Sequence, residues 1–245
     1  MMKKRNVVLI HGWGASSWVW QPLIAELSAD FNFYPIDLPG YGKAQNHSFG
    51  TIEQVVTSLF NDIPESSLVI GWSLGGLIAR QLAMIAPDKV QALITIASPP
   101  CFVKSDSWNG LAPEQLLAFK QALVENVRRV KQRFCALQIQ GSKKPSDFGL
   151  WSKHFIQDNV SVEALSQGLE VLRTADFRGV EADFEQPQLH LYGDCDRIAP
   201  FTASYYQKTG LNYQIIMGAA HLPLLSHLHE LVAQVRMYSY DKATI

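Results

Sequence analysis

Ser73 stands in a sequence pattern that can make it a nucleophile. It lies between Gly71 and Gly75 in the pattern G-x-S-x-G, after the apolar run 68–70 and before a segment of helical period. Small residues two positions on either side allow a turn so tight that the hydroxyl projects above the carboxyl edge of a sheet. A serine hydroxyl is a weak nucleophile at neutral pH, so it needs a base and an orienting acid. We therefore predict acyl transfer through Ser73.

The base and the acid are expected in loops that follow the last two apolar runs. His221 follows the last run, and Asp194 and Asp196 follow the run before it. Loops at the carboxyl ends of parallel strands meet at one edge of a sheet, where they can reach Ser73. We predict His221 as the base. Asp196 is the favoured acid, and Asp194 is the alternative.

Three other histidines compete with His221 as the base. His190 is expected within a strand. His227 and His229 open the predicted last helix, and we expect them to be surface or capping residues. None of the three is preferred as the base.

Acyl transfer also needs hydrogen-bond donors for an oxyanion. The N–H of Leu74, the residue after the nucleophile, is one candidate. The segment His11–Gly14 follows the first apolar run, and we assign the second donor to the N–H of Trp13. His11 is expected to be structural.

Short apolar runs rich in β-branched residues alternate with segments of helical period, which is typical of an α/β fold with a mostly parallel central sheet and helices on both faces. The expected strands are 7–10, 33–36, 68–70, 92–96, 190–192 and 213–217. Between about Pro99 and Gln186 the pattern is almost purely helical. We predict a core of residues 1–99 and 187–245, interrupted by a helical cap of residues 100–186.

The composition excludes several classes of protein. The chain has 245 residues, of which 47% are apolar, and a net charge of -1, which excludes disorder and gives no reason to expect nucleic-acid binding. No run approaches the about 18 apolar residues of a membrane span, and the run 7–10 after Lys3–Arg5 is too short for export. We expect a cytoplasmic protein that binds no membrane. Without CxxC or zinc-ligand spacing, no metal site or disulfide scaffold is expected around the three cysteines, Cys101, Cys135 and Cys195.

The predicted cap concentrates positive charge. Between Lys120 and Lys153 two acidic residues accompany eight basic ones, so the segment carries +6 and the rest of the chain carries -7. A solvated helix face explains such a segment, and so does a docking surface for an acidic protein or an anionic substrate. The basic residues are Lys120, Arg128, Arg129, Lys131, Arg133, Lys143, Lys144 and Lys153.

Taken together, the motifs resemble the α/β-hydrolase superfamily from Val7 to the last helix. Four segments resemble more specifically the pimeloyl-[acyl-carrier protein] methyl ester esterases of biotin biosynthesis: His11–Gly14, Gly71–Gly76, Arg133–Gln138 and Gly168–Leu172. The resemblance implies a serine carboxylesterase without cofactors that removes the methyl group from a pimeloyl chain on its carrier protein and releases methanol.

The resemblance also implies roles for individual residues. Ser73, Asp196 and His221 would form the triad, and Arg129 and Arg133 would contact the acyl carrier protein. The substrate site would comprise Trp13, Ser73, Leu74, Phe134, Cys135, Ala136, Leu137, Gln138 and His221. The chain departs from the family's pattern before Val7, where a strand hairpin is missing, and later in the cap, where Ser146 replaces an arginine. Lys143, Lys144 and Lys153 are candidates to replace the missing charge.

Other functions on the same fold stay open at this point. The runner-up is a carboxylesterase of broad specificity that acts on small free esters. A lyase and a non-catalytic ligand-binding protein are further alternatives, because the fold alone does not fix the reaction. We expect a monomer in each case.

Overall fold

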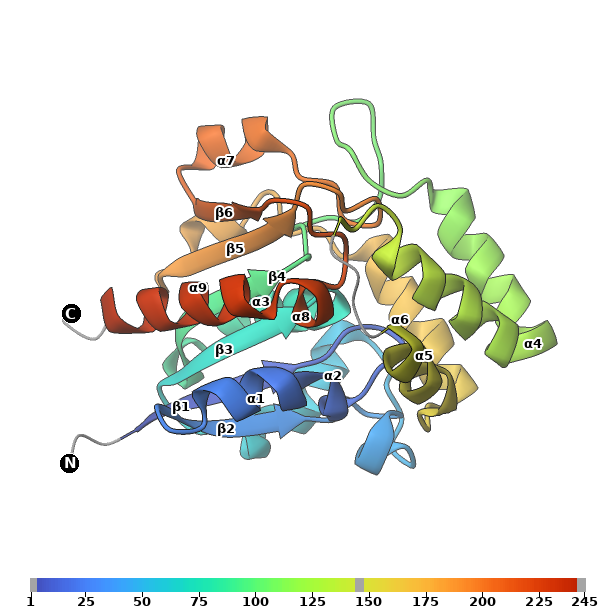
Figure 1. Ribbon diagram of the computed structural model, residues 1–245, viewed down its shortest axis with the longest axis horizontal. Coiled ribbons are helices and arrows are strands. Elements are labelled where there is room, and N and C mark those ends of the chain that lie inside the picture. Colours follow the sequence, from blue (N-terminus) through green and yellow to red (C-terminus); the bar gives the residue numbers. More distant parts are fainter. Residues whose placement is uncertain (1–3, 144–147, 242–245) are drawn as a thin grey trace.

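A single parallel sheet forms the centre of the structure (Figure 1). The computed structural model describes residues 4–143 and 148–241, without the side chains of 239–241. Within these residues six strands pair in the order β2-β1-β3-β4-β5-β6, all of them parallel. Their bounds are β1 (Arg5–Ile10), β2 (Phe31–Ile36), β3 (Ser67–Trp72), β4 (Val90–Ile96), β5 (Gln188–Gly193) and β6 (Asn212–Ile216).

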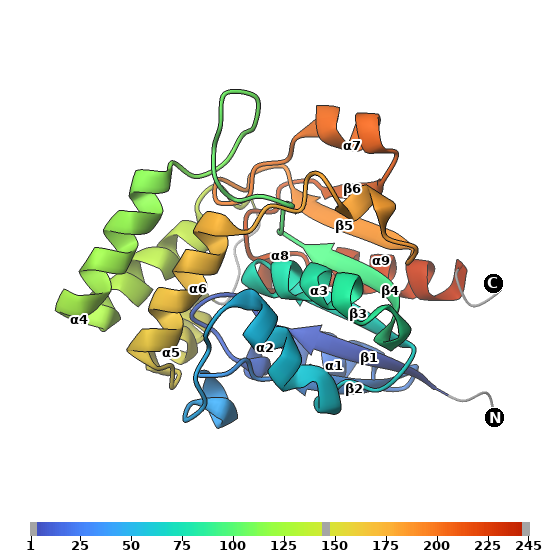
Figure 2. The same cartoon turned by 180° about the vertical axis from the view of Figure 1, so that it is seen from behind.

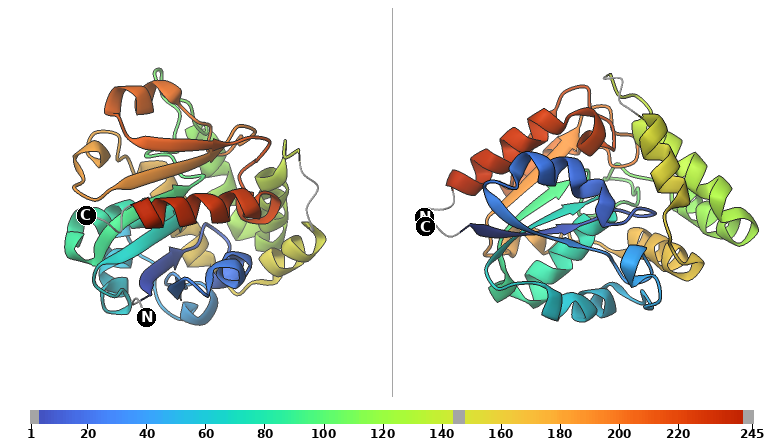
Figure 3. Two further views of the ribbon diagram at one scale, coloured as in Figure 1. Left: turned by 60° about the vertical axis from the view of Figure 1, so that its left-hand side comes forward. Right: turned by 60° about the horizontal axis from the view of Figure 1, so that its bottom comes forward.

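Helices cover both faces of the sheet, which buries the apolar side chains of its central strands. Every residue of β3 is buried, as expected for a parallel strand between two helical layers. One face carries α1 (Gln21–Leu27), α8 (Pro223–Ser226) and α9 (Leu228–Asp241), and the other carries α2 (Ile52–Leu59) and α3 (Leu74–Ile85) (Figures 2 and 3). The sheet is also flanked by α7 (Ala203–Thr209) and by the 3₁₀ helices η1 (Ser17–Trp20), η2 (Gly42–Ala44), η3 (Phe60–Asp62) and η4 (Pro87–Lys89), and η5 (Glu181–Asp183) lies where the chain returns to β5. The predicted fold class is confirmed.

Strand register decides which loops meet at the carboxyl edge. Ile10 of β1 pairs with Gly71 of β3, so the segment after β1 lies beside the segment after β3. On the other side Gly193 of β5 pairs with Ile216 of β6, so the loops after these two strands also lie together. The strand order therefore gathers the loops of all the predicted catalytic residues at one edge.

The chain between β4 and β5 forms a helical layer over that edge (Figure 1). Its helices are α4 (Pro113–Ile139), α5 (Phe148–Gln157) and α6 (Val162–Thr174). The backbone of α4 leaves helical geometry at Asn126, with φ -160° and ψ 92°, and the Asn126 side chain then accepts the N–H of Arg129. That contact caps the second arm, because a side-chain oxygen satisfies a free N–H at a helix start. The cap thus carries a two-armed helical hairpin. No helix of the described residues has the length and apolarity needed to cross a membrane.

The sequence predicts His227 to be a surface or capping residue: it is not on the surface, but it does occupy the C-cap position of α8. His227 is 1% exposed and lies in the short turn between α8 and α9, close to the Gly218 backbone. The last helix, α9, begins at Leu228 as predicted, and the short helix α8 before it was not predicted. His229, two residues further on, is exposed as expected.

The turn from β3 into α3 depends on its two glycines. Ser73 between them has φ +54° and ψ -119°, a backbone conformation that L residues rarely adopt. A Cβ on Gly71 would lie 2.3 Å from the Gly75 carbonyl oxygen, and a Cβ on Gly75 would lie 2.2 Å from the Ile10 carbonyl oxygen. Neither position has room for any side chain.

Gly75→Ala is expected to lower the free energy of unfolding by about 3 kcal/mol, because the new methyl group must displace backbone of β1. Gly149→Ala is the matched control, since a Cβ there meets nothing within 4 Å. That change should leave stability unchanged or raise it by up to about 1 kcal/mol, because alanine favours a helix. Urea unfolding followed by circular dichroism measures both. Equal stability of the two variants would contradict the steric account.

Candidate active site

Three side chains from separate loops form a continuous hydrogen-bonded chain at the carboxyl edge. The His221 Nε2 atom lies 2.9 Å from Ser73 Oγ, and His221 Nδ1 lies 2.8 Å from Asp196 Oδ2. All three residues are buried. An ionised carboxylate can only accept, so we assign the ring proton to Nδ1, which leaves Nε2 to accept the serine proton. The arrangement can activate Ser73 as a nucleophile.

The two aspartates of the loop after β5 have different partners. Asp196 faces His221, and its second oxygen accepts the N–H groups of Ile198 and Ala199 at 2.8 and 2.9 Å. Asp194 instead accepts the N–H of Gly218 and so ties its own loop to the loop that leads to His221. Asp196 is therefore the carboxylate placed to orient the imidazole.

The candidate oxyanion donors lie on either side of the serine. Leu74 is the first residue of α3, so its N–H has no acceptor within the helix. Trp13 follows Gly12, and a Cβ on Gly12 would lie only 3.1 Å from Ser73 Cβ. In the described chain the Trp13 N–H makes no backbone hydrogen bond. Both peptides therefore lie next to Ser73, and neither N–H makes a backbone hydrogen bond among the described residues.

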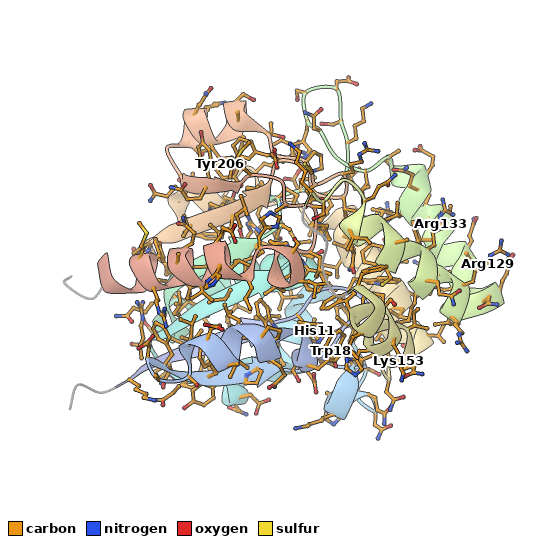
Figure 4. All side chains as sticks on the ribbon, in the orientation of Figure 1. His11, Trp18, Arg129, Arg133, Lys153 and Tyr206 are labelled. Carbon is orange, nitrogen blue, oxygen red and sulfur yellow. The ribbon has the colours of Figure 1, made fainter. Side chains whose placement is uncertain are left out.

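His11 fixes the peptide that carries one of these donors. Its Nε2 accepts the N–H of Leu38 at 3.0 Å, so Nδ1 carries the proton and donates to the Gly12 carbonyl oxygen at 2.9 Å. Burial lowers the pKa of His11, which keeps the ring neutral. The Gly12 carbonyl and the Trp13 N–H belong to one planar peptide, so fixing the first sets the direction of the second. His11 therefore has a structural role, in line with its prediction, and Figure 4 shows it at the cap side of the core.

The two tryptophans near the serine are structural supports. The Trp13 indole donates to the Leu165 carbonyl oxygen at 2.8 Å and packs edge-on against Phe134. The Trp72 indole donates to the backbone oxygen of His221 at 2.9 Å. Trp13 and Trp72 are fully buried. They hold the cap and the histidine loop in place, and neither tryptophan lines the cavity that contains Ser73, although the resemblance implies Trp13 in the substrate site.

A cavity of about 460 Å³ opens from Ser73 between the core and the cap. Of the run Phe134–Gln138, only Phe134 and Leu137 line it, because a helix turns just every third or fourth side chain to one side. The structure does not bring Cys135, Ala136 or Gln138 to the cavity: Ala136 is exposed, and the other two are packed inside the cap. The full lining is Ser73, Phe102, Gly110, Leu111, Glu114, Gln115, Leu116, Ala118, Phe119, Arg133, Phe134, Leu137, Gln140, Leu169, Leu172, Arg197 and Ile198.

Sequence reasoning missed most of this lining. Phe102 and Leu111 come from the loop before α4, Phe119 from its first arm, and Leu169 and Leu172 from α6. The three-residue spacing of Leu169 and Leu172 was the one available signal. A larger groove of about 590 Å³ lies on the other side of α6 and contains none of the catalytic residues, so volume alone does not locate the chemistry.

The predicted docking residues lie in two places: on the second arm of α4 and in the segment that follows α4. Arg129 and Arg133 lie on the second arm of α4 and are exposed (Figure 4). The Arg133 guanidinium also lies 5.1 Å from the centre of the Phe119 ring and borders the cavity. Lys143 packs against the loop at Gly218, and Lys144 lies outside the described residues. In the part of the chain that the structure describes, no group of three or more His, Cys, Asp and Glu residues could hold a metal ion.

A buried ion pair joins the cap to the core beneath the catalytic edge. The Arg80 guanidinium of α3 contacts the Glu181 carboxylate, and both side chains are fully buried. Burial is the largest single influence and lowers the pKa of Arg80. The Glu181 carboxylate together with Tyr192 and Tyr206 outweighs that effect and raises the pKa overall. Arg80 also donates to the Ser98 carbonyl oxygen at 3.0 Å. Ser98 lies where the chain leaves the core for the cap, and Glu181 lies where it returns. The Arg80 side chain therefore binds both segments that connect the core to the cap.

Comparison with known proteins agrees with this geometry. Residues 7–235 match the model of the alpha/beta hydrolase family. A pimeloyl-[acyl-carrier protein] methyl ester esterase from Pectobacterium carotovorum subsp. carotovorum is 40% identical over 94% of this chain and 92% of the relative. One of the same name from Proteus mirabilis is 39% identical over 93% of this chain and 89% of the relative.

The chain belongs to the pimeloyl-[acyl-carrier protein] methyl ester esterase family of alpha/beta hydrolases. Among solved structures, an esterase from Exiguobacterium antarcticum superposes with a TM-score of 0.85 and covers 97% of this chain and 92% of that one. Its sequence identity of 18% supports the alpha/beta hydrolase fold alone. The family assignment makes this chain an enzyme of the serine hydrolase type.

Asp196→Asn is expected to lower kcat of this hydrolase by about 10⁴-fold, because an amide in that place favours the wrong imidazole tautomer. Asp194→Asn should leave most of the activity, since an asparagine oxygen can still accept the Gly218 N–H. Hydrolysis of p-nitrophenyl acetate measures both, and circular dichroism checks that both variants fold. A larger loss in the Asp194 variant would show that the acid is misassigned.

Proposed function

We propose that this chain hydrolyses the methyl ester of pimeloyl-acyl-carrier protein to pimeloyl-acyl-carrier protein and methanol, the esterase step of biotin biosynthesis. The observation that carries the proposal is the hydrogen-bonded chain of Ser73, His221 and Asp196 at one end of an apolar cavity. The names of relatives that match more than nine-tenths of the chain support the substrate. We further propose that the enzyme works in the cytoplasm as a monomer.

The first half of the reaction transfers the acyl group to the enzyme. His221 removes the Ser73 proton as Oγ attacks the methyl ester carbonyl, and Asp196 stabilises the charge that forms on the imidazole. The N–H groups of Trp13 and Leu74 bind the oxyanion, and each such donor contributes about 2.7 to 4 kcal/mol to the transition state. Protonated His221 then gives its proton to the leaving methoxide, which departs as methanol.

The second half returns the enzyme to its starting state. His221 takes a proton from water, the hydroxide attacks the ester that joins Ser73 to the acyl chain, and the same oxyanion donors act again. The products are a free carboxylate on the pimeloyl chain and a neutral serine. All the groups required are side chains and peptides of this chain.

The apolar cavity suits the acyl chain of the proposed substrate, and the exposed arginines on the second arm of α4 suit its carrier protein. Side chains such as Phe102, Leu169 and Leu172 can cover the methylene chain, whose burial supplies binding energy at roughly 25 cal/mol per Å². Arg129 lies outside the cavity on the exposed second arm of α4, where it can meet an acidic carrier protein. Such charges mainly raise the rate of encounter.

Ser73→Ala is expected to reduce kcat for methyl pimeloyl-carrier protein by about 10⁶-fold, because the nucleophile is lost and only binding and the oxyanion donors remain. Methanol release measures the rate, and labelling of Ser73 in the unaltered enzyme by a fluorophosphonate probe gives an independent readout. Wild-type turnover by the variant would exclude the mechanism. Absence of labelling would favour a non-catalytic protein.

Arg129→Glu is expected to lower kcat/KM for the carrier-bound ester by about tenfold at low salt, because reversed charge slows the encounter with an acidic partner. The free methyl ester should be unaffected, since Arg129 does not line the catalytic cavity. Steady-state assays of both substrates, repeated at high salt, test this. An enzyme that treats the two esters alike, with or without Arg129, would be the carboxylesterase of broad specificity.

A further inference from the structure

Arg197 borders the catalytic cavity without a partner of its own. It follows Asp196 directly and lines the same cavity as Ser73. The backbone around it is fixed, because Asp196 accepts the N–H groups of Ile198 and Ala199. Its side chain is exposed and makes no hydrogen bond or ion pair with the described residues. The triad therefore carries a free cation beside it, held on a rigid turn.

Few charged side chains line this cavity, and they come from different sides of it. Arg133 belongs to the cap wall, where its guanidinium lies over the Phe119 ring. Glu114 comes from the first turn of α4, and it forms no ion pair with Arg197. Arg197 is the cation on the core wall, next to Ile198. A chain that is apolar along most of its length but carries one oxygen acceptor would satisfy both the apolar walls and this donor.

The proposed substrate has this chemistry. Its methylene chain carries a methyl ester carbonyl at one end and, at the other, the carbonyl of the thioester that joins it to the carrier. A serine nucleophile can attack either carbonyl. Selective removal of the methyl group thus requires that the second carbonyl be held away from Ser73.

We propose that Arg197 is a specificity-determining residue that donates a hydrogen bond to this second carbonyl oxygen of the substrate. The proposal deepens the proposed function, because it explains how one enzyme cleaves the methyl ester and leaves the thioester intact. It also predicts that the enzyme recognises a second carbonyl in substrates without any carrier protein.

Two small esters test the proposal directly. Dimethyl pimelate and methyl heptanoate have acyl chains of equal length, but only the first carries a second carbonyl. Arg197→Ala should lower kcat/KM for dimethyl pimelate by about tenfold, the scale of one hydrogen bond from a charged donor, and leave methyl heptanoate unchanged. A merely structural role would lower both alike. Equal loss on both esters, or no loss on either, overturns the proposal.

A matched variant and a third ester sharpen the test. Arg128→Ala removes an exposed cap arginine that lines none of the cavities described above, and it should change neither ester. Monomethyl pimelate replaces the neutral second carbonyl with a carboxylate. If Arg197→Ala lowers kcat/KM only for monomethyl pimelate, Arg197 binds a carboxylate rather than a neutral carbonyl, and the proposal is overturned.

The carrier-bound ester separates this inference from the proposed function. If the unaltered enzyme fails to hydrolyse methyl pimeloyl-carrier protein, the proposed function fails, whereas the comparison of the two small esters still tests Arg197. If the carrier-bound ester is hydrolysed, Arg197→Ala should increase the share of product formed by thioester cleavage. Free carrier thiol, measured beside methanol, reports that share, and an unchanged share contradicts the proposal.

Discussion

The contact of the Gly75 backbone with the carbonyl oxygen of Ile10 is the constraint on which the catalytic centre depends. It lets α3 begin directly beside β1, and this close approach forces Ser73 into its rare backbone conformation. The same approach places the peptide after Gly12 next to the serine. The nucleophile and the candidate oxyanion donors are therefore positioned mainly by one packing contact between two backbones, and the buried His11 ring sets the direction of the peptide after Gly12.

The remaining catalytic groups are positioned by polar contacts between loops. Trp72 holds the backbone of His221, Asp194 holds the start of the same loop, and the turn after Asp196 is closed by that residue's own carboxylate. Each of these hydrogen bonds is buried or partly buried, where leaving it unmade would be costly. The loops are consequently rigid although they have no regular secondary structure.

The sequence was informative where one local pattern determines the outcome. Each predicted strand falls within or beside an observed one, because a buried parallel strand is a continuous apolar run. The elbow at Ser73 needs glycine at two positions, and that requirement is visible in the chain. The choice between Asp194 and Asp196 could only be a preference, because both residues lie in one loop and the register of β5 with β6 decides which faces the histidine.

The cavity could not be predicted in the same way, since its walls come from five separate stretches of the chain: Ser73, 102–119, 133–140, 169–172 and 197–198. Assigning all of Phe134–Gln138 to the substrate ignored the helical turn, which sends three of the five side chains elsewhere. Arg197 belongs to no recognisable sequence motif. Only its position in the wall of the cavity that contains Ser73 indicates a role.

The ion pair at Arg80, where the chain enters and leaves the cap, has a consequence for how such enzymes diversify. Since the exit at Ser98 and the return at Glu181 meet at one guanidinium, the distance between the two crossing points is independent of what the chain does between them. Insertions, deletions or whole replacements of the intervening helices can then occur without altering the sheet. Cap helices that bind a different substrate can therefore evolve between these two points while the catalytic residues of the core stay the same.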